Sequence, residues 1–465
     1  MAIEVSCLVI IGGGFSGAVA AVEFLRVAPP GSKLILINRS GKIARGLAYG
    51  TASEHHLLNV PAGNMSALVS DANSFVEYCK GLIPATEPGS FVSRATYGRY
   101  LEQLLAIAEE QRITDVECVR VIDEVVGLTK ENGSVSVLLK TGLTLKADHL
   151  LLAFGNFSPV DPVAVDKQEM RDSYISDPWG SEMGSVRSED EKVLLIGSGL
   201  TAVDMLLTLK RAHPSRKVVM LSRRGLTPCG HRKNVPHHTP QPHVQEELLT
   251  SQPSARGYLK IIRRAVAHEP SQWRDLLTAL RPITAQLWQR LPEDEKRRFV
   301  RHVQAYWDVH RHRVAPVTFG EFEQYSSRGE VEIIAGRLIS LTREPDGASV
   351  RIRRRGSSVE EKLTFDKVIN CTGPCNNVSR TNDEFVKFLL EQKLILPDIL
   401  KLGLEVGSDY QVLDGSGNAQ PWLSYVGPML KAQFWEATAV PELRIHAKNV
   451  AMHIANLFDN KNQKK

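Results

Sequence analysis

The stretch LVIIGGGFSG, from Leu8 to Gly17, decides the fold that this sequence predicts. Its first four residues are apolar, as in a buried strand, and the alanine-rich run 18–24 that follows is typical of a helix. Between them, Gly12, Gly14 and Gly17 have the G-x-G-x-x-G spacing of a dinucleotide-binding turn. Gly12 permits the tight turn, Gly14 lets the backbone approach a pyrophosphate, and Gly17 lets the helix pack on the strand. The alternative interpretation is a glycine-rich turn in an α/β protein that binds no nucleotide.

Composition places the chain among ordinary globular proteins. It has 465 residues, 43% of them hydrophobic and 23% charged, which predicts two or three domains with a substantial core. No apolar run approaches the roughly 18 residues of a membrane span, and Glu4 before the first strand argues against a signal peptide. Six scattered cysteines favour a reducing cytoplasm over a disulfide scaffold. A net charge of +5 suits anionic ligands and is too small to predict nucleic-acid binding.

A second strand is expected at 33–37, and Asn38 follows it about 20 residues after Gly17. That position usually carries Asp or Glu, which binds the adenosine ribose hydroxyls. An amide can bond a ribose hydroxyl without the assistance of a charge. Asn38 is therefore a candidate ribose contact that departs from the usual pattern.

Two blocks after this strand carry a specific resemblance. GLAYGT at 46–51 and HLLNVPAG at 56–63 resemble the bacterial FAD/NAD(P)-binding oxidoreductase family, whose members include proteins described as FAD-dependent urate hydroxylases. FVSRATYGRYL at 91–101, WDVHRHRVAP at 307–316 and FWEATAVPELR at 434–444 are similar to further blocks of that family. The resemblance implies an FAD site with the long loop 41–68 crossing near the flavin. The alternative is a surface loop between two domains.

A second dinucleotide unit is predicted from Val193. An apolar strand at 193–196 precedes GSGLTA at 197–202, which repeats the fingerprint with Ala202 in the third place. About 20 residues later, Arg223 and Arg224 replace the acidic residue that would favour NADH. Guanidinium groups there match a 2′-phosphate, so the unit predicts NADPH, the alternative being a solvated basic turn.

The Rossmann alternation stops between 227 and 316, where a helical insert is expected. Its first part, HRKNVPHHTPQPH at 231–243, is an irregular loop whose histidine spacing matches no metal-binding pattern. Apolar residues then recur at three- and four-residue intervals between 273 and 310, as in helices. His310, Arg311, His312 and Arg313 either cap a solvated helix end, or some of them lie over the active-site cleft and attract an anionic substrate. His310 and Arg313 are candidates for catalysis only because their block resembles the family and combines proton-transfer and anion-binding groups, and no catalytic base can be named.

The C-terminal part returns to strand patterns at 331–334, 350–354 and 363–371, and a last strand is expected at 422–427. Short strands are also expected at 116–126, 135–139 and 149–155. Cys371 and Cys375 are separated by three residues and are interpreted as packing thiols rather than a redox pair. A terminal helix should begin near Val440 or Pro441 with Thr438 as a cap. In related flavoproteins such a helix aims its N-terminus at the flavin, whereas the alternative is a simple docking helix.

These patterns together predict an α/β fold with two Rossmann-like domains, for FAD and NADPH, and a helical insert. The expected boundaries are 1–160 and 331–465 for the two parts of the FAD-binding domain and 190–330 for the NAD(P)-binding domain. The candidate cofactor contacts are Gly12, Gly14, Phe15, Ser16, Gly17, Asn38, Arg45, Asn59, Gly155, Gly197, Gly199, Thr201, Ala202, Arg223, Arg224, Gly373, Gly427 and Thr438.

Two fingerprints in one chain imply hydride transfer from nicotinamide to flavin. The family resemblance favours a monooxygenase that uses oxygen to hydroxylate a small anionic heterocycle, with urate as the first candidate. The alternatives are a flavin reductase or dehydrogenase with another acceptor, and a nucleotide-binding protein without activity. No metal, nucleic acid or membrane is expected as a partner, and the oligomeric state is left open.

Overall fold

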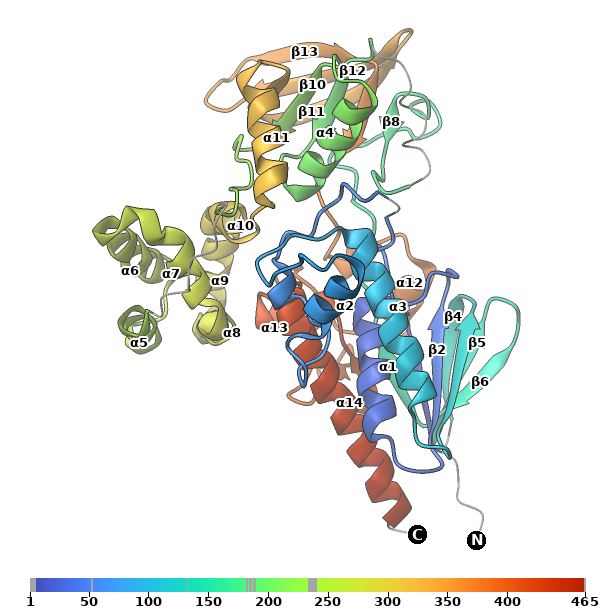
Figure 1. The fold of residues 1–465 in the computed structure, drawn as a ribbon. Helices are drawn as coiled ribbons and strands as arrows, with labels where there is room; N and C mark the ends of the chain where they lie inside the picture. The colour runs from blue at the N-terminus through green and yellow to red at the C-terminus, as the bar shows by residue number, and fades with distance from the viewer. Residues whose placement is uncertain are drawn as a thin grey trace.

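The computed structural model describes residues 6–51, 53–131, 133–180, 183, 186, 190–232 and 241–463. The described chain forms two sheet-containing parts, one above the other in Figure 1, with a group of helices to one side. The lower part holds both the N-terminal and the C-terminal elements, so the chain leaves this part and later returns to it. The mixed α/β architecture confirms the predicted fold class.

The lower part is built on a six-stranded sheet in the order β15-β16-β7-β1-β2-β3. Its strands are β1 (Cys7–Ile11), β2 (Lys33–Asn38), β3 (Glu117–Ile122), β7 (His149–Leu152), β15 (Gln411–Leu413) and β16 (Ala419–Tyr425). All neighbours pair in parallel except β15 and β16. β1 is apolar and buried on both faces, as a central strand of a parallel sheet requires.

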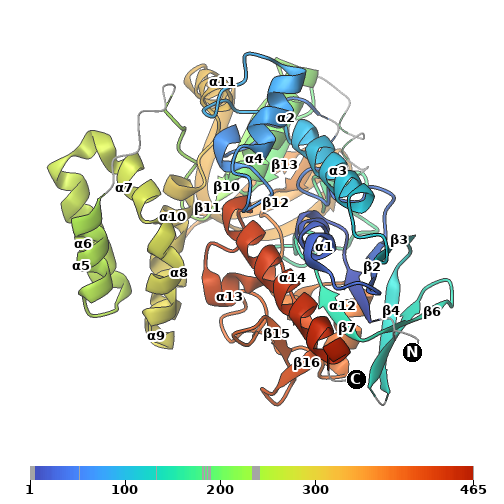
Figure 2. The ribbon, with the colours of Figure 1, turned by 60° about the horizontal axis from the view of Figure 1, so that its bottom comes forward.

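Helices cover one face of this sheet, and a small sheet lies on the other side of it. The helices of the lower part are α1 (Phe15–Val27), α2 (Ser74–Leu82), α3 (Arg94–Glu110), α12 (Glu384–Glu391), α13 (Lys431–Phe434) and α14 (Val440–Gln463). Figure 2 shows α14 running alongside α1, and the two helices are in contact. The small antiparallel sheet consists of β4 (Val125–Glu131), β5 (Ser134–Leu139) and β6 (Thr144–Ala147).

The upper part is built on a seven-stranded sheet in the order β13-β12-β11-β10-β9-β14-β8. Its strands are β8 (Tyr174–Ile175), β9 (Val193–Ile196), β10 (Val218–Ser222), β11 (Val331–Glu344), β12 (Gly347–Arg354), β13 (Glu360–Phe365) and β14 (Lys367–Asn370). The strands from β8 to β11 are parallel, and the long β11 then pairs antiparallel with β12. The helices α4 (Leu200–Ala212) and α11 (Pro316–Ser327) pack on this sheet.

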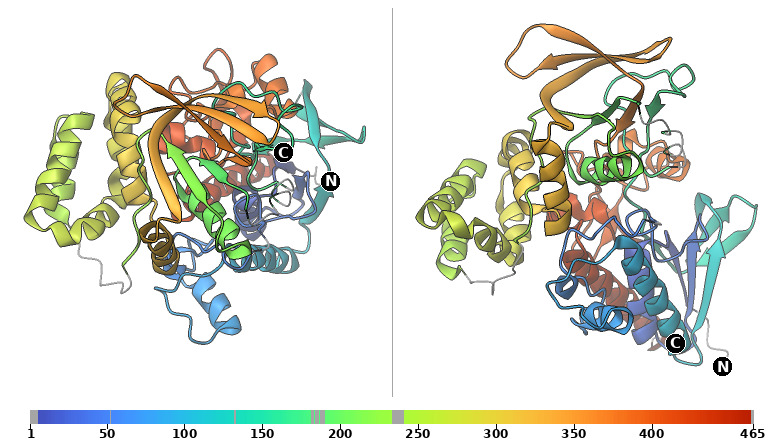
Figure 3. Two further views of the ribbon diagram at one scale, coloured as in Figure 1. Left: turned by 90° about the horizontal axis from the view of Figure 1, so that it is seen from above. Right: turned by 45° about the horizontal axis from the view of Figure 1, so that its top comes forward.

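The helices beside these parts come from one continuous region of the chain. They are α5 (Pro242–Thr250), α6 (Ala255–His268), α7 (Trp273–Ala279), α8 (Arg281–Arg290), α9 (Glu293–Arg298), the π-helical segment η4 (Phe299–Val303) and α10 (Gln304–Arg311). Figure 3 shows this helical insert to one side of both sheets in two further views. Its own apolar core includes Leu248, Leu276 and Trp288.

One strand expected from the sequence is wrong in its extent. The stretch 363–371 was expected as one strand, but it contains the end of β13 and all of β14, which are separated at Asp366. The two strands occupy different places in the same sheet, since β13 pairs with β12 and β14 pairs with β9 and β8. The stretch 116–126 likewise holds β3 of one sheet and the start of β4 of another.

Candidate functional site

The first glycine fingerprint forms the turn between β1 and α1. Gly12 has a φ of +111°, and a Cβ atom on it would lie 2.8 Å from the carbonyl group of Ala153. A Cβ on Gly17 would overlap the carbonyl oxygen of Gly12. The contacts of the protein itself therefore require glycine at both positions, whether or not a nucleotide binds.

Gly14 is different, because its own surroundings leave room for a side chain. A Cβ there would have one neighbour within 4 Å, the Cα of Gly46 at 3.5 Å, an ordinary contact distance. The loop that contains Gly46 lies over the fingerprint, and the Ala44 amide donates to the Gly13 carbonyl over 2.7 Å. A ligand can therefore approach the backbone closely at Gly14, as the binding of a pyrophosphate requires.

Other predicted FAD contacts gather around this turn. Asn38 Oδ1 accepts a hydrogen bond from the Gly13 amide at 3.2 Å, while its Nδ2 donates to the Ser40 carbonyl at 2.5 Å. The guanidinium of Arg45 donates to both carboxylate oxygens of Glu102 at 2.6 Å. The side chains of Asn38 and Arg45 thus hold the turn and its loop in place in the protein itself.

Phe15, Ser16, Gly155 and Gly427 also serve the packing of the lower part. Phe15 is buried near the rings of Tyr49 and Tyr97, and Ser16 is buried on α1. A Cβ on Gly155 would lie 2.5 Å from Pro428 Cγ, and Gly427 has a φ of +148°. These positions bring the end of β7 close to the turn that leads from β16 to α13.

A cleft of about 1350 Å³ lies where the lower part, the upper part and the insert meet. Seven of the predicted residues line it: Asn59, Gly197, Gly199, Thr201, Arg313, Gly373 and Thr438. A Cβ on Gly199 would meet nothing within 4 Å, so the backbone of the second fingerprint is open to a ligand. The described lining does not include Gly12, Gly14, Phe15, Ser16, Gly17, Asn38, Arg45, Gly155, Ala202, Gly427 or His310.

The start of α14 borders the cleft at Thr438, Ala439 and Val440. The Leu443 amide donates to the Ala439 carbonyl at 2.9 Å, the first intrahelical bond of α14. Ala439 therefore occupies the N-cap position that the sequence assigned to Thr438, which precedes it by one residue. With Ala439 as the N-cap, the positive end of the helix dipole still lies beside the cleft.

The second fingerprint is joined to the end of β10. Ser198 Oγ donates to Ser222 Oγ at 2.7 Å, and the Gly225 amide donates to the same Ser222 oxygen at 3.1 Å. The intervening Arg223 and Arg224 line a second, smaller cavity of about 430 Å³. The two predicted arginines thus lie next to the fingerprint and outside the main cleft.

The main cleft has a basic wall, supplied mostly by the insert. Arg232 pairs with Asp275 at 2.7 Å, Arg281 pairs with Glu442, and Arg311 lies 3.0 Å from Glu436. Arg274 and Arg313 differ from these arginines, since neither forms an ion pair with a carboxylate of the described chain.

Arg274 and Arg313 instead make contacts with neutral groups. Arg274 Nε donates to the Gly230 carbonyl at 3.0 Å, and Arg313 Nη2 donates to Thr278 Oγ1 at 3.1 Å. Both guanidinium groups lie near the ring of Trp273, at 4.3 and 5.9 Å from its centroid. Burial, followed by repulsion from Arg311 and Arg274, lowers the pKa of Arg313 to about 10. A bound anion would offset the repulsion and compensate the buried charge.

Buried polar atoms without partners point to the same wall. Arg311 Nε, Arg313 Nε and Asp308 Oδ1 are buried and have no hydrogen-bond partner in the described chain. Such atoms are unusual in a folded protein and indicate a ligand or ordered water. All three residues line the cleft.

Of the two interpretations of the 307–316 block, His310 follows the one that keeps it on the helix, because it does not line the cleft. Its Nδ1 donates to the Tyr306 carbonyl at 2.7 Å, and its ring packs edge-on against Trp273. His312 lines the cleft instead, and burial lowers its pKa. His231 also lines the cleft, where its Nε2 donates to the Asn59 carbonyl at 3.0 Å and burial lowers its pKa to about 4.

Arg311, His312 and Arg313 line the cleft, as one of the two interpretations of the 307–316 block expected for some of its cations. Other cleft residues were not singled out from the sequence: Arg274, Asp308, Lys431 and Glu436. Most of them stand in or beside the family blocks at 307–316 and 434–444, which was the available signal. Arg274 stands outside these blocks and had none.

The predicted histidine-rich loop lies largely outside the described residues, which omit 233–240. Elsewhere in the described chain, no three His, Cys, Asp or Glu side chains come together as a potential metal site. Cys371 is buried and Cys375 partly buried, and both are free thiols. Over the described ranges, no helix has the length and apolar character needed to cross a bilayer.

Comparisons with known proteins agree with this geometry. Residues 9–157 match the FAD-NAD(P)-binding family, whereas curated proteins give no significant sequence match. The match covers the first fingerprint and the strands β1, β2, β3 and β7 that surround it, so the predicted cofactor class, FAD with NAD(P), is confirmed.

Three solved structures share the whole fold at low sequence identity. Ornithine hydroxylase from Pseudomonas aeruginosa has 16% identity and a TM-score of 0.63, over 97% of this chain and 99% of that one. Ornithine N-hydroxylase from Kutzneria sp. 744 has 14% identity and a TM-score of 0.66, over 98% and 100%. L-lysine 6-monooxygenase from Pseudomonas syringae has 15% identity and a TM-score of 0.65, over 98% and 99%. Their names refer to amino acids and not to urate.

Proposed function

We propose that the protein is an FAD-dependent, NADPH-using monooxygenase whose substrate is a small anion. The observation that carries the proposal is the convergence in one cleft of the second fingerprint, the N-terminus of α14 and a wall of buried arginines. The similarity in fold to three amino-acid hydroxylases supports the class of reaction. The arginine wall favours a substrate that carries an anionic group.

The first fingerprint would hold FAD, with Gly14 admitting the pyrophosphate and the adjoining residues 44–49 leading from it to the cleft. Asn38 would approach the adenosine ribose. Gly199 and Thr201 would bind the pyrophosphate of NADPH, and Arg223 and Arg224 its 2′-phosphate. Bound at this site, FAD would supply the redox chemistry: it would be reduced by hydride from NADPH, and the reduced flavin would deliver the electrons to oxygen. The N-terminus of α14 would favour negative charge on the flavin side of the cleft.

Arg274, Arg311 and Arg313 would bind and orient the substrate anion. Guanidinium groups present fork-shaped donors that match planar carboxylates and similar anions. A substrate bound in this way would displace water from the cleft and would hold its reacting atom in a fixed place. Where a proton must move, His312 replaces His310 as the candidate, since it lines the cleft 3.7 Å from Asp308 Oδ1.

Two classes of substrate carry an anionic group that would fit this wall. The family resemblance proposes an electron-rich heterocycle, and urate is the first candidate. The three hydroxylases of similar fold favour the carboxylate of an amino acid as the second class. Both would be bound by the same arginines and differ in the group that faces the flavin.

The test measures NADPH oxidation and oxygen uptake by the purified yellow protein, with urate, related purines, L-ornithine and L-lysine supplied separately. Hydrogen peroxide is quantified in each reaction, with catalase added in a parallel set. The proposal expects one compound to stimulate both rates and to yield a hydroxylated product in proportion to NADPH consumed. If all the oxygen consumed appears as peroxide for every compound, these substrates are excluded. Reduction of an artificial acceptor without oxygen uptake would favour a reductase, and no turnover would favour a binding protein.

A further inference from the structure

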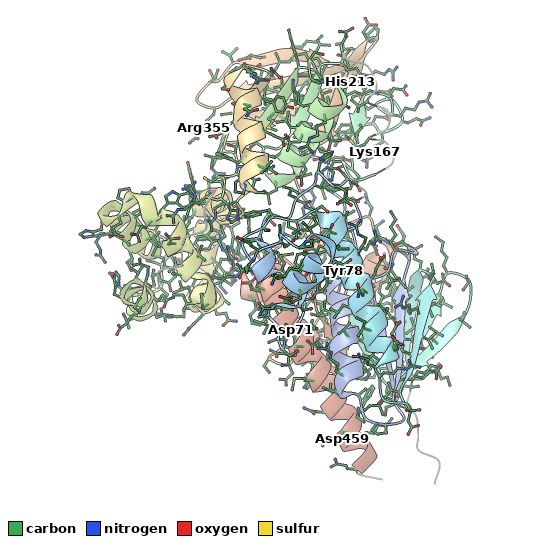
Figure 4. All side chains as sticks on the ribbon, in the orientation of Figure 1. Asp71, Tyr78, Lys167, His213, Arg355 and Asp459 are labelled. Atoms are coloured by element: carbon green, nitrogen blue, oxygen red, sulfur yellow. The ribbon has the colours of Figure 1, made fainter. Side chains whose placement is uncertain are left out.

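A second cavity, distinct from the main cleft, is surrounded by positive charge. It has a volume of about 430 Å³, and its described lining consists of Arg223, Arg224, Arg301, His302, Arg337 and Arg355. These residues come from the end of β10, from η4 of the insert, from β11 and from the turn after β12. Figure 4 labels Arg355 on the upper part, above the helices of the insert.

The five arginines are not neutralised by the protein. None of them forms an ion pair with a carboxylate of the described chain, and the described lining of the cavity contains no acidic residue. The neighbouring Arg354, by contrast, pairs with Glu361 at 2.9 Å and with Glu332 at 3.8 Å. Carboxylates therefore lie near the cavity without lining it. Arg223, Arg301, Arg337 and Arg355 are exposed, so solvent screens part of their mutual repulsion, and a bound anion would offset the remainder.

The cavity is linked to the second fingerprint through Ser222. Ser198 of the fingerprint donates to Ser222 Oγ at 2.7 Å, and Arg223 follows Ser222 directly. A dinucleotide whose pyrophosphate lies at Gly199 would place its adenosine ribose at the end of β10, as Rossmann units do. The charged group of the ligand at this position would be the 2′-phosphate.

The insert contributes to the cavity through direct contacts with the end of β10. Arg224 Nη2 donates to the Arg301 carbonyl at 2.8 Å. The Arg224 guanidinium also lies 5.9 Å from the ring centroid of Tyr306 on α10. These contacts hold the π-helical segment η4 against the Rossmann unit and keep Arg301 at the cavity. The segment continues through α10 to Arg311 of the main cleft.

We propose that Arg301, supplied by the helical insert, completes the binding site for the 2′-phosphate of NADPH together with Arg223 and Arg224. This inference rests on the NADPH part of the proposed function and extends it. Coenzyme selectivity then belongs to two parts of the chain, the Rossmann unit and the insert. The insert would contact both the coenzyme phosphate, through Arg301, and the substrate anion, through Arg311.

The test uses ligand fragments and therefore needs no turnover. Isothermal titration measures the binding of 2′,5′-ADP, which has the 2′-phosphate, and of 5′-AMP, which lacks it, to the FAD-loaded protein. Arg301→Ala should raise the Kd of 2′,5′-ADP at least about tenfold, equivalent to about 1.4 kcal/mol. The same change should leave the Kd of 5′-AMP within about twofold. Arg297→Ala is the matched control, because Arg297 is exposed on α9 of the insert and does not line the cavity.

The other outcomes decide against the proposal in different ways. If Arg301→Ala and Arg301→Gln bind 2′,5′-ADP as the unsubstituted protein does, the insert is not part of the site, even if monooxygenase activity is found. If both variants lose 2′,5′-ADP and 5′-AMP equally, Arg301 does not recognise the 2′-phosphate. If inorganic phosphate competes with both fragments alike, the cavity binds anions without selectivity. A different outcome separates the two proposals. If Arg301→Ala selectively weakens 2′,5′-ADP binding but no compound stimulates oxygen uptake, the proposed reaction is overturned and this inference stands.

Discussion

Arg311 Nη2 lies 3.0 Å from Glu436 Oε2, and the two side chains are only 9% and 3% exposed. The other oxygen of Glu436 accepts a hydrogen bond from Trp307 Nε1 at 3.1 Å. Arg311 and Trp307 belong to the insert, whereas Glu436 precedes α14. The preceding Trp435 has a φ of +22° and packs between Trp288 and Phe299. The insert therefore fixes the segment that leads to the N-terminus of α14 beside the cleft.

The Glu436→Gln substitution should destabilise the protein by about 3 kcal/mol, because removing one partner of a buried ion pair leaves the other charge unpaired. The measurement is urea unfolding of the holoprotein, with FAD content determined in parallel. The double variant Arg311→Met/Glu436→Leu should be less destabilised than the single one, since no buried charge remains. A single substitution that changes stability by less than about 1 kcal/mol would show that the pair behaves as an exposed one.

Gly14→Val should give a folded protein that loses most of its FAD. The nearest atom to a Cβ at Gly14 is 3.5 Å away, so the chain tolerates a side chain, while the valine methyl groups would occupy the space of the pyrophosphate. Gly12→Val is the contrasting variant, because its φ of +111° is strained for any other residue and folding itself should suffer. The readouts are far-UV circular dichroism and the flavin absorbance of the purified proteins. A full complement of FAD in Gly14→Val would refute the assignment of the first fingerprint.

Arg223→Ala/Arg224→Ala should raise the Michaelis constant for NADPH at least about tenfold and leave that for NADH nearly unchanged. Each charge-assisted hydrogen bond to a phosphate contributes about 1.5–3 kcal/mol before non-additivity is considered. Steady-state oxidation of both coenzymes by the same preparation provides the comparison. An equal effect on NADPH and NADH would mean that these arginines do not recognise the 2′-phosphate.

His149 should make the protein less stable in mild acid. Its Nε2 lies 3.0 Å from Ser424 Oγ between β7 and β16, and burial lowers its pKa from 6.5 to about 3. The unfolded chain therefore binds more protons than the folded one as the pH falls below about 6.5, and the free energy of unfolding decreases by up to about 1.4 kcal/mol per pH unit from this group. His149→Gln should flatten the pH dependence of urea unfolding between pH 6.5 and 4. An unchanged slope would show that His149 binds its proton equally in the folded and the unfolded chain.

The parts of the fold predicted correctly from the sequence are those that depend on neighbouring residues. The strand at 8–11 and the strand at 193–196 are each followed at once by glycines that the local turn requires. The extent of 363–371 was wrong because its strand pattern continues through Asp366, and only the pairing of distant strands separates β13 from β14.

The cleft residues were harder to predict because their positions depend on long-range packing. Helix α10 ends at Arg311, so His312 and Arg313 leave the helical spacing and turn toward the cleft while His310 stays on the helix. Arg274 reaches the cleft because α7 lies against Gly230, which is 44 positions away in the sequence. Helical periodicity contains no information about either contact.

The last prediction concerns the two cleft arginines without a carboxylate partner. Arg313→Ala and Arg274→Ala should each lower kcat/KM for the substrate by at least about tenfold, because each removes a charge-assisted contact to its anionic group. The compound used is the one among urate, L-ornithine and L-lysine that stimulates oxygen uptake, and its binding is also measured by isothermal titration.

Arg343→Ala serves as the control, since Arg343 is an exposed residue of β11 that pairs with Asp172 and does not line the cleft. Arg313→Lys should retain part of the binding that Arg313→Ala loses, since it keeps the charge but lacks the fork-shaped donors. Unchanged binding in both alanine variants would show that the anion lies elsewhere in the cleft, and weaker binding in the control would show an effect of net charge alone.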